Sequence, residues 1–329
     1  MSPGLKKILK YFLTAAITLV LLWLAFRGVH WGDFWEALGR CNWWWIIASM
    51  ATSMAVAYSR GCRWRYMLPG KFSRRECFDA YNVCYLANLG VPRSGEIVRC
   101  AMLSSTGRIS FEEAVGSMAL ERTWDMITAL LIGVAMFFFT RFGTFVKEQM
   151  WDKFAQSLSF SAVWLVFGVI LLALALLWVI WRLRDKSPLM GKIWGFFKGL
   201  GSGVKAGFTM KHKVPFFLHT IFIWTAYVFQ TLFIIYAFPD VGHLGFSDAL
   251  FLMMVGSLGW FVPVQGGFGS FHFITALALT SVYGLSQQTG LVFATISHES
   301  QILQMLINGV ISLISYSVLT RRRKKGSAA

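Results

Sequence analysis

Charged residues are scarce in this 329-residue chain. Asp, Glu, Lys and Arg make up 14% of it, against about a quarter of an ordinary soluble protein. Hydrophobic residues make up 56% and aromatic residues 16%, and several apolar runs reach the roughly 20 residues that a membrane-spanning helix needs. These proportions exclude a cytosolic enzyme and predict an integral membrane protein.

Signatures of catalysis and of metal binding are also missing. The sequence has no Walker loop, no GxSxG nucleophile elbow and no HExxH pair. Its five cysteines form neither a CxxC pair nor a cluster with histidine, so neither a disulfide framework nor a zinc site is indicated. We therefore predict no catalytic residue, no metal site and no cofactor.

The formal net charge of +16 could suggest a nucleic-acid partner. Most of the 31 Lys and Arg residues, however, lie in short runs beside apolar segments, where they set the orientation of a membrane protein and contact anionic lipid. We expect membrane lipids, and not nucleic acid, as partners. A homodimer or an enzyme of lipid biosynthesis remains open as a protein partner.

Six apolar runs are predicted to span the membrane. The first ends at Phe26 and lacks a cleavage site after it, so we expect a retained helix and not a signal peptide. The other five runs are residues 43–59, 114–140, 160–181, 214–238 and 291–319. A further amphipathic segment, residues 31–40, is expected to lie on the outer membrane interface.

Two more apolar stretches, residues 76–92 and 250–279, are interrupted by glycine, proline and polar residues. Of the 31 Lys and Arg residues, 25 lie in the tails and loops that would face the cytoplasm if both termini do, and that bias fixes the orientation. Each interrupted stretch then crosses the membrane twice or not at all. We predict two re-entrant helical hairpins that enter from opposite faces, because broken backbone survives in a membrane only inside protein or beside a wet cavity.

The two hairpins share a short VPxxG pattern, at residues 91–95 and 262–266. The pattern suggests an inverted repeat of the kind that builds transporter sites, although chance recurrence in a glycine-rich chain is the alternative. The predicted fold is therefore an all-α polytopic membrane protein with about six spanning helices and two re-entrant hairpins. Residues 1–329 are predicted to form a single transmembrane domain, with a basic cytoplasmic loop at residues 182–213.

Charged residues next to the first hairpin form the first candidate site. Arg93 and Arg99 offer forked donors that match a phosphate. Glu96 lies three residues from each and could orient an arginine or bind a cationic headgroup. A solvated cytoplasmic loop is the alternative reading.

The third span contains the second candidate site, which consists of Glu121, Arg122 and Asp125. Ionisable residues within a membrane helix cost about 2.5 to 3.5 kcal/mol each and usually face an interior cavity. Arg122 can pair with Asp125 at i+3, which leaves a carboxylate for another partner. In either a functional or a purely structural reading, this cluster is expected to lie against residues 93–99.

Glycines and histidines mark the third candidate site. Gln265, Gly266 and Gly267 lie in the second hairpin, where exposed backbone could approach a phosphate. His272 follows them, and His298 and Glu299 lie in the last span. Close helix packing is the alternative for the glycines, and a hydrogen-bonded packing role is the alternative for each histidine.

These motifs together resemble a known family. The pattern Pro92-x-x-Gly95-Glu96-x-x-Arg99, the Glu121-Arg122-x-x-Asp125 helix, a span containing Trp224 and the Pro263-x-x-Gly266-Gly267-x-Gly269 segment are similar to the transmembrane domain of lysylphosphatidylglycerol synthases. The similarity covers roughly residues 10–320, and motifs in the right order are more specific than any one alone. Two departures occur. This chain has His272 where the family often has an acidic residue soon after the glycine-rich motif, and it lacks the arginine that the family often has in the last span, near His298.

The resemblance implies a free-standing flippase-like domain without the soluble aminoacyl-transferring domain. Its substrate would be a charged-headgroup lipid, either a phospholipid, an aminoacylated phospholipid or a polyprenyl-phosphate-type lipid. It would lie in a bacterial or archaeal cytoplasmic membrane. Two alternatives remain: a membrane-embedded glycosyl- or phosphoryl-transferase acting on lipid-linked substrates, and a non-catalytic partner of a lipid-biosynthesis enzyme.

Overall fold

The computed structural model describes residues 16–27, 29–151, 162–262 and 264–326. Every regular element in these ranges is a helix, and none of them contains a strand. Three helical segments are long and apolar enough to cross a membrane: α6 (Phe111–Phe139), α11 (Lys213–Ala237) and residues Gln287–Thr320 of α14 (Gln287–Gly326). The chain is an all-α membrane protein, as the composition predicts.

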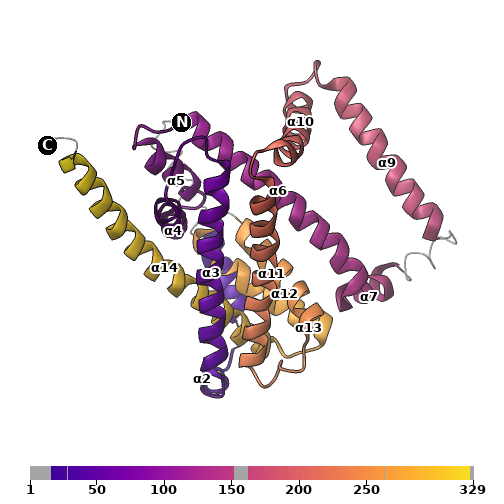
Figure 1. Cartoon of the computed structure of the whole chain (residues 1–329). Helices are drawn as coiled ribbons and strands as arrows, with labels where there is room; N and C mark the ends of the chain where they lie inside the picture. Colours follow the sequence, from indigo (N-terminus) through magenta and orange to yellow (C-terminus); the bar gives the residue numbers. More distant parts are fainter. Residues whose placement is uncertain (1–15, 28, 152–161, 263, 327–329) are drawn as a thin grey trace. The chain divides into compact units, whose positions relative to one another are not determined.

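The helices form two compact units (Figure 1). Unit 1 consists of Met1–Met118 and Val214–Ala329, and unit 2 consists of Ala119–Lys213. The boundary falls within α6, so this helix contributes to both units. A single transmembrane domain that includes both units stays our prediction.

In unit 1, α3 (Trp43–Met67) and α11 pack side by side and antiparallel (Figure 1). At one end of the pair, the Asn42 N–H donates to the carbonyl oxygen of Ala237 at 2.9 Å. Toward the other end, the hydroxyl oxygen of Ser59 lies 2.7 Å from Nδ1 of His219. The C-terminal ends of α3 and α11 therefore point in opposite directions, and the segments that follow them begin at opposite ends of unit 1.

The segment after α3 is a helical hairpin made of α4 (Arg74–Gly90) and α5 (Gly95–Ser104). A capping box between Ser73 and Glu76 begins α4, since each side chain accepts from the other residue's backbone N–H. Pro92 disfavours helical geometry at the residue before it, and α4 ends just ahead of that position. We call residues 91–94, where the chain turns back, the first tip.

The segment after α11 is a second hairpin. It consists of α12 (Phe246–Phe261), the short η2 (Gln265–Gly267) and α13 (Ser270–Tyr283). Its arms pack closely, because a Cβ at Gly259 would lie 2.6 Å from the Cα of Phe271. Three glycines of the turn, Gly266, Gly267 and Gly269, have φ angles of 55°, 74° and 77°. Residues with a side chain rarely adopt such positive φ angles. We call residues 264–269 the second tip.

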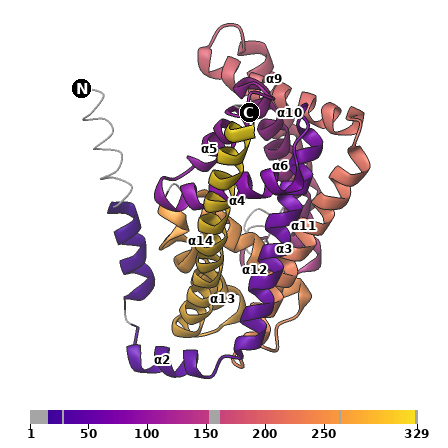
Figure 2. The same cartoon turned by 60° about the vertical axis from the view of Figure 1, so that its left-hand side comes forward.

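The long helix α14 runs along both hairpins and packs against α4 and α13 (Figure 2). The hydroxyl of Ser315 donates to Oδ2 of Asp79 in α4 at 2.5 Å. Gly309 lets the two helices approach closely, because a Cβ there would lie 2.6 Å from the Cβ of Leu86. A single helix thereby holds both hairpins in one unit.

Among the residues that the structure describes, unit 2 contains the later part of α6 and four further elements. These are α7 (Arg141–Val146), η1 (Lys147–Trp151), α9 (Ala162–Leu183) and α10 (Pro188–Thr209). The indole N–H of Trp124 in α6 donates to the carbonyl oxygen of Gly203 in α10 at 3.2 Å. The predicted basic loop at residues 182–213 is thus mostly a helix, which fits its amphipathic pattern.

The structure covers each predicted span with a helix in the residues that it describes. Of the first predicted span, only Ala16–Phe26 is described, and its earlier residues lie outside the described ranges. The segment at residues 31–40 forms α2 (Trp31–Gly39), and its position on the outer membrane interface stays a prediction.

The bounds of the first predicted hairpin differ from the structure. Residues 76–92, predicted as the whole first hairpin, form only its first arm. The second arm is α5, which contains Glu96 and Arg99. The charged residues of this segment are the reason that the sequence predicts a loop there. The first candidate cluster therefore lies within the hairpin, from its tip into its second arm, and not beyond it.

Candidate functional site at the meeting of two hairpin tips

In unit 1 the tip of each hairpin contacts the end of the helix that leads into the other tip. The guanidinium of Arg93, at the first tip, donates to the carbonyl oxygen of Phe261 at the end of α12, with an N–O distance of 3.0 Å. A Cβ on Gly266 of the second tip would lie 3.2 Å from Cδ2 of Leu89 in α4. Because the hairpins begin at opposite ends of the α3–α11 pair, they approach this contact from opposite ends of unit 1. Their entry from opposite faces of the membrane stays a prediction.

Arg93 adopts an unusual conformation to make this contact. Its φ angle is 61°, and no other described residue except glycine has a positive φ. The carbonyl that it binds is one of the last in α12, which lack partners within the helix and carry the negative end of its dipole. An arginine has five N–H donors, and Arg93 is exposed, so its remaining donors can still bind an anion.

The first tip is also held by its own arms. The backbone N–H of Gly95 donates to Oδ1 of Asn88 at 2.7 Å, and the hydroxyl of Ser94 donates to the carbonyl oxygen of Ala87 at 3.1 Å. In the first turn of α5, one carboxylate oxygen of Glu96, Oε2, is buried without a hydrogen-bond partner. A buried acceptor of this kind needs a donor, and a ligand at the tip could supply it.

Arg99 lies deeper, in the core of the first hairpin. Its side chain is fully buried, and its guanidinium carbon lies 4.5 Å from the ring centroids of both Trp64 in α3 and Tyr81 in α4. Stacking between two aromatic faces stabilises a cation that has left water. These contacts hold the guanidinium in place, so Arg99 has a structural role in the core of the first hairpin.

Two more buried arginines, Arg60 and Arg63, lie one turn apart in α3. Arg60 donates to the hydroxyl oxygens of Tyr227 and Tyr81, at 2.9 and 3.5 Å. Arg63 donates to the hydroxyl oxygen of Thr220 at 3.2 Å. From the sequence, both arginines are expected in a cytoplasmic loop, because the predicted second span ends at residue 59. The helical spacing of these residues and of the following tryptophan was the signal that could have extended the span.

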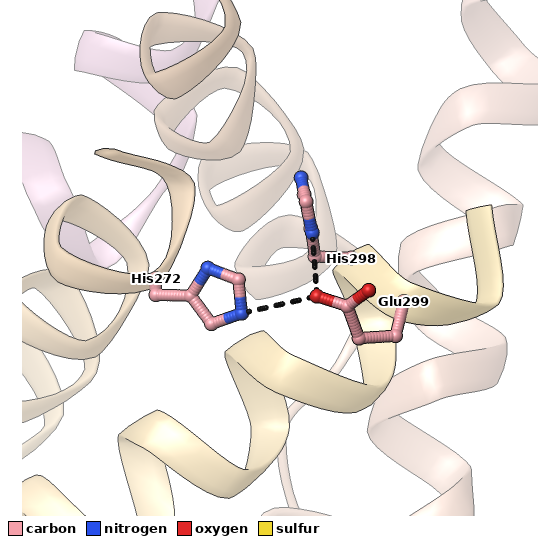
Figure 3. Close-up of side chains that lie close together, drawn as sticks. All are labelled: His272, His298 and Glu299. Atoms are coloured by element: carbon pink, nitrogen blue, oxygen red, sulfur yellow. Dashed lines mark hydrogen bonds and ion pairs between the residues drawn. The ribbon is translucent and has the colours of Figure 1, made fainter. Parts of the chain in front are cut away.

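The second tip joins α14 through a histidine. Nε2 of His298 lies 2.8 Å from the carbonyl oxygen of Gly266, and Nδ1 of the same ring lies 3.0 Å from Oε1 of Glu299. Nε2 of His272, in α13, lies 3.5 Å from the same carboxylate oxygen (Figure 3). We call His272, His298 and Glu299 the histidine–glutamate trio.

Aromatic rings surround His298 and keep it dry. The rings of Phe268, Phe271 and Trp260 have centroids 4.9, 5.2 and 5.3 Å from that of His298. Both histidines of the trio are buried, whereas the side chain of Glu299 is 42% exposed. The carboxylate therefore connects a buried pair of imidazoles to the surface of unit 1.

The cluster predicted in the third span lies in unit 2. Arg122 pairs with Glu121 at 3.3 Å and with Asp125 at 3.5 Å, so the helix neutralises part of its own charge, as its spacing predicts. The predicted approach of this cluster to residues 93–99 would join the two units, and it stays a prediction.

The structure thus groups the predicted residues as follows. The residues at or beside the two tips are Arg93, Glu96, Gln265, Gly266 and Gly267. The trio lies behind the second tip, and Arg99 lies in the core of the first hairpin. The third group, which lies in unit 2, consists of Glu121, Arg122 and Asp125. A role in substrate binding stays a prediction for each of them.

Comparison with known proteins adds the family. Residues 11–309 match the family described as lysylphosphatidylglycerol synthase TM region. The chain belongs to this family. It is therefore a multi-pass membrane protein of a family linked to lipid metabolism or translocation. No curated protein and no solved structure shows a significant match to the chain.

Proposed function

We propose that this member of the lysylphosphatidylglycerol synthase transmembrane family moves lipids with phosphate-containing, charged headgroups between the two leaflets. The observation that carries the proposal is the contact between the tips of two hairpins that begin at opposite ends of unit 1. Broken helices that meet inside a membrane protein are how many transporters build a substrate site. Both termini would face the cytoplasm of a bacterial or archaeal cell.

The residues at the first tip suit such a headgroup. The exposed donors of Arg93 would bind the phosphate, with the forked geometry that arginine offers. The buried oxygen of Glu96 would accept a hydrogen bond from a headgroup amine or hydroxyl. The acyl chains would stay in the bilayer, beside the exposed apolar side chains of the outer helices.

Nothing in the sequence motifs supplies ATP hydrolysis. Movement would then follow the lipid gradient or the gradient of an ion. The rigid stacking of Arg99 and the hydrogen bonds of Gly95 would keep the first tip in place. The second tip, with three glycines at positive φ, would be the part that changes its backbone conformation.

Leaflet exchange in proteoliposomes tests the proposal. Purified protein is reconstituted with fluorescent phosphatidylglycerol, and the fraction of probe reached by a membrane-impermeant quencher is followed over time. Lipid products are extracted from the same vesicles, since a transferase would form a new product. Exchange without product supports translocation, and product formation or exchange no faster than in empty liposomes contradicts it.

Glu96→Gln is the matched test of the tip. It keeps the size of the side chain and removes the charge at the buried oxygen, so exchange should slow about tenfold or more, which corresponds to about 1.4 kcal/mol. Glu112→Gln is the control, because Glu112 is exposed in the first turn of α6. Equal exchange rates in the two variants would show that Glu96 does not contact the lipid.

A further inference from the structure

We infer that the histidine–glutamate trio is a binding site for a divalent transition-metal ion of the zinc class. One ligand atom from each of His272, His298 and Glu299 lies within 4.8 Å of the other two. Two imidazoles and one carboxylate form a ligand set that zinc uses in proteins. The sequence pattern predicts no metal site, because the second ligand lies 26 positions after the first and no motif links them.

Two of the three distances between ligand atoms of the trio are close to those of a metal site, and all three are within 4.8 Å. Ligand atoms around a tetrahedral zinc ion, with bonds of about 2.0 to 2.1 Å, lie about 3.3 Å apart. Here Oε1 of Glu299 lies 3.0 Å from Nδ1 of His298 and 3.5 Å from Nε2 of His272. Small rotations of the three side chains would bring them around one ion.

The surroundings of His298 also fit a metal ligand. A histidine that binds a metal almost always donates its other ring N–H to a carboxylate, a backbone carbonyl or water. Nε2 of His298 lies 2.8 Å from the carbonyl oxygen of Gly266, so Nδ1 is the nitrogen left for the ion. The hydrogen bond fixes both the tautomer and the orientation of the ring.

The hydrogen bonds of His298 favour the same conclusion. Both of its ring nitrogens face acceptors, the carbonyl of Gly266 and the carboxylate of Glu299. A neutral imidazole has one N–H, which can serve only one of these two acceptors. An ion bound to Nδ1 satisfies the ring and the carboxylate together.

The location of the site suggests its effect. His272 begins the second arm of the second hairpin, and the other two ligands belong to α14. The ion would therefore fasten the hairpin to the helix that also packs on α4. Three protein ligands leave a fourth position for water, and the half-exposed Glu299 gives the ion a route in.

Metal binding is measured on the full-length protein in detergent, purified with a tag that contains no histidine. Zinc is titrated in competition with a chromophoric chelator, and cobalt(II) is titrated as a spectroscopic probe of coordination. We expect one zinc ion per chain, visible absorption bands typical of tetrahedral cobalt, and a higher thermal unfolding temperature with zinc. Lipid exchange is not part of this readout, so its outcome does not depend on the proposed function.

Variants assign the site. His272→Ala and His298→Ala should each weaken zinc affinity by more than about 100-fold, beyond the usual effect of losing an outer-shell partner. Glu299→Gln, a mild change at a half-exposed side chain, should weaken it by about tenfold or more and should shift the cobalt bands. His243→Ala is the control, because His243 is exposed in the segment between α11 and α12.

Three results would overturn the inference. The first is a folded wild-type protein that binds no stoichiometric zinc, which would leave the trio as a proton-sharing hydrogen-bond network. The second is zinc binding that survives in folded Glu299→Gln with unchanged affinity and unchanged cobalt bands. The third is a loss of binding in His243→Ala equal to that in the histidine variants of the trio.

Discussion

Gly95, at the start of α5, should be one of the least replaceable residues of the first hairpin. A Cβ on this residue would lie 2.0 Å from the carbonyl oxygen of Cys84 and 2.9 Å from Cγ of Asn88. Side-chain carbons essentially never approach other heavy atoms closer than 3.0 Å. In Gly95→Ala the start of α5 must therefore move away from α4 by about 1 Å or more.

The cost of that movement has two parts. Overpacking of a close contact costs about 1 to 3 kcal/mol. The hydrogen bond from the Gly95 N–H to Asn88, at 2.7 Å, would be stretched as well, and such bonds contribute about 1 kcal/mol each. A combined loss of about 2 kcal/mol or more should lower the unfolding temperature by roughly 4 to 8 °C.

Thermal unfolding in detergent, followed by tryptophan fluorescence and by the fraction that remains monodisperse, measures this loss. Gly90→Ala is the matched control at the other end of the same turn, since a Cβ there meets nothing within 4 Å. The control should unfold within about 0.5 kcal/mol of the wild type. If Gly95→Ala unfolds at the same temperature as Gly90→Ala, the close approach of α5 to α4 is not real.

Two further predictions concern unit 2 and the contact between the tips. In α10 of unit 2, Gly207→Ala would place a Cβ 2.1 Å from Nε1 of Trp124 and should lower the free energy of unfolding by about 1 to 3 kcal/mol. The control Gly199→Ala has open space around the new Cβ and should unfold at the wild-type temperature. Equal unfolding temperatures of the two variants would contradict the close packing of Gly207 on Trp124. Ser94→Cys combined with Gln265→Cys should cross-link with a short bifunctional thiol reagent in native membranes, because each tip contacts the helix end that leads into the other. After proteolysis between the two sites, mobility on a denaturing gel shows whether the two fragments are linked. Absence of a cross-link even with longer reagents would contradict the contact.

The sequence predicts the broad architecture well, because its signals are local. Apolar runs give the helices, and glycine and proline within two of those runs give the hairpins. The bias of Lys and Arg toward one side gives opposite entry of the hairpins. Contacts between α3 and α11 and between the two tips agree with that prediction.

The same charge bias hides the buried arginines. An arginine that follows an apolar run is assigned to the cytoplasm, so the sequence places Arg60 and Arg63 outside the membrane helix. In the structure each of them has a partner in α11, Tyr227 for Arg60 and Thr220 for Arg63, more than 150 positions away in the chain. A sequence pattern within one segment contains no information about partners at that distance.

The VPxxG pattern shows how a shared motif can serve two different geometries. Gly95 lies within α5, where only a hydrogen atom fits against the carbonyl of Cys84. Gly266 has a φ angle of 55°, and a Cβ added there would meet only side-chain atoms, at 3.2 Å or more. The first glycine is therefore required by space and the second by backbone conformation. What the two halves share is the order of helix, break and helix, so the relation between them lies in the topology of the hairpins and not in the detailed geometry of their tips.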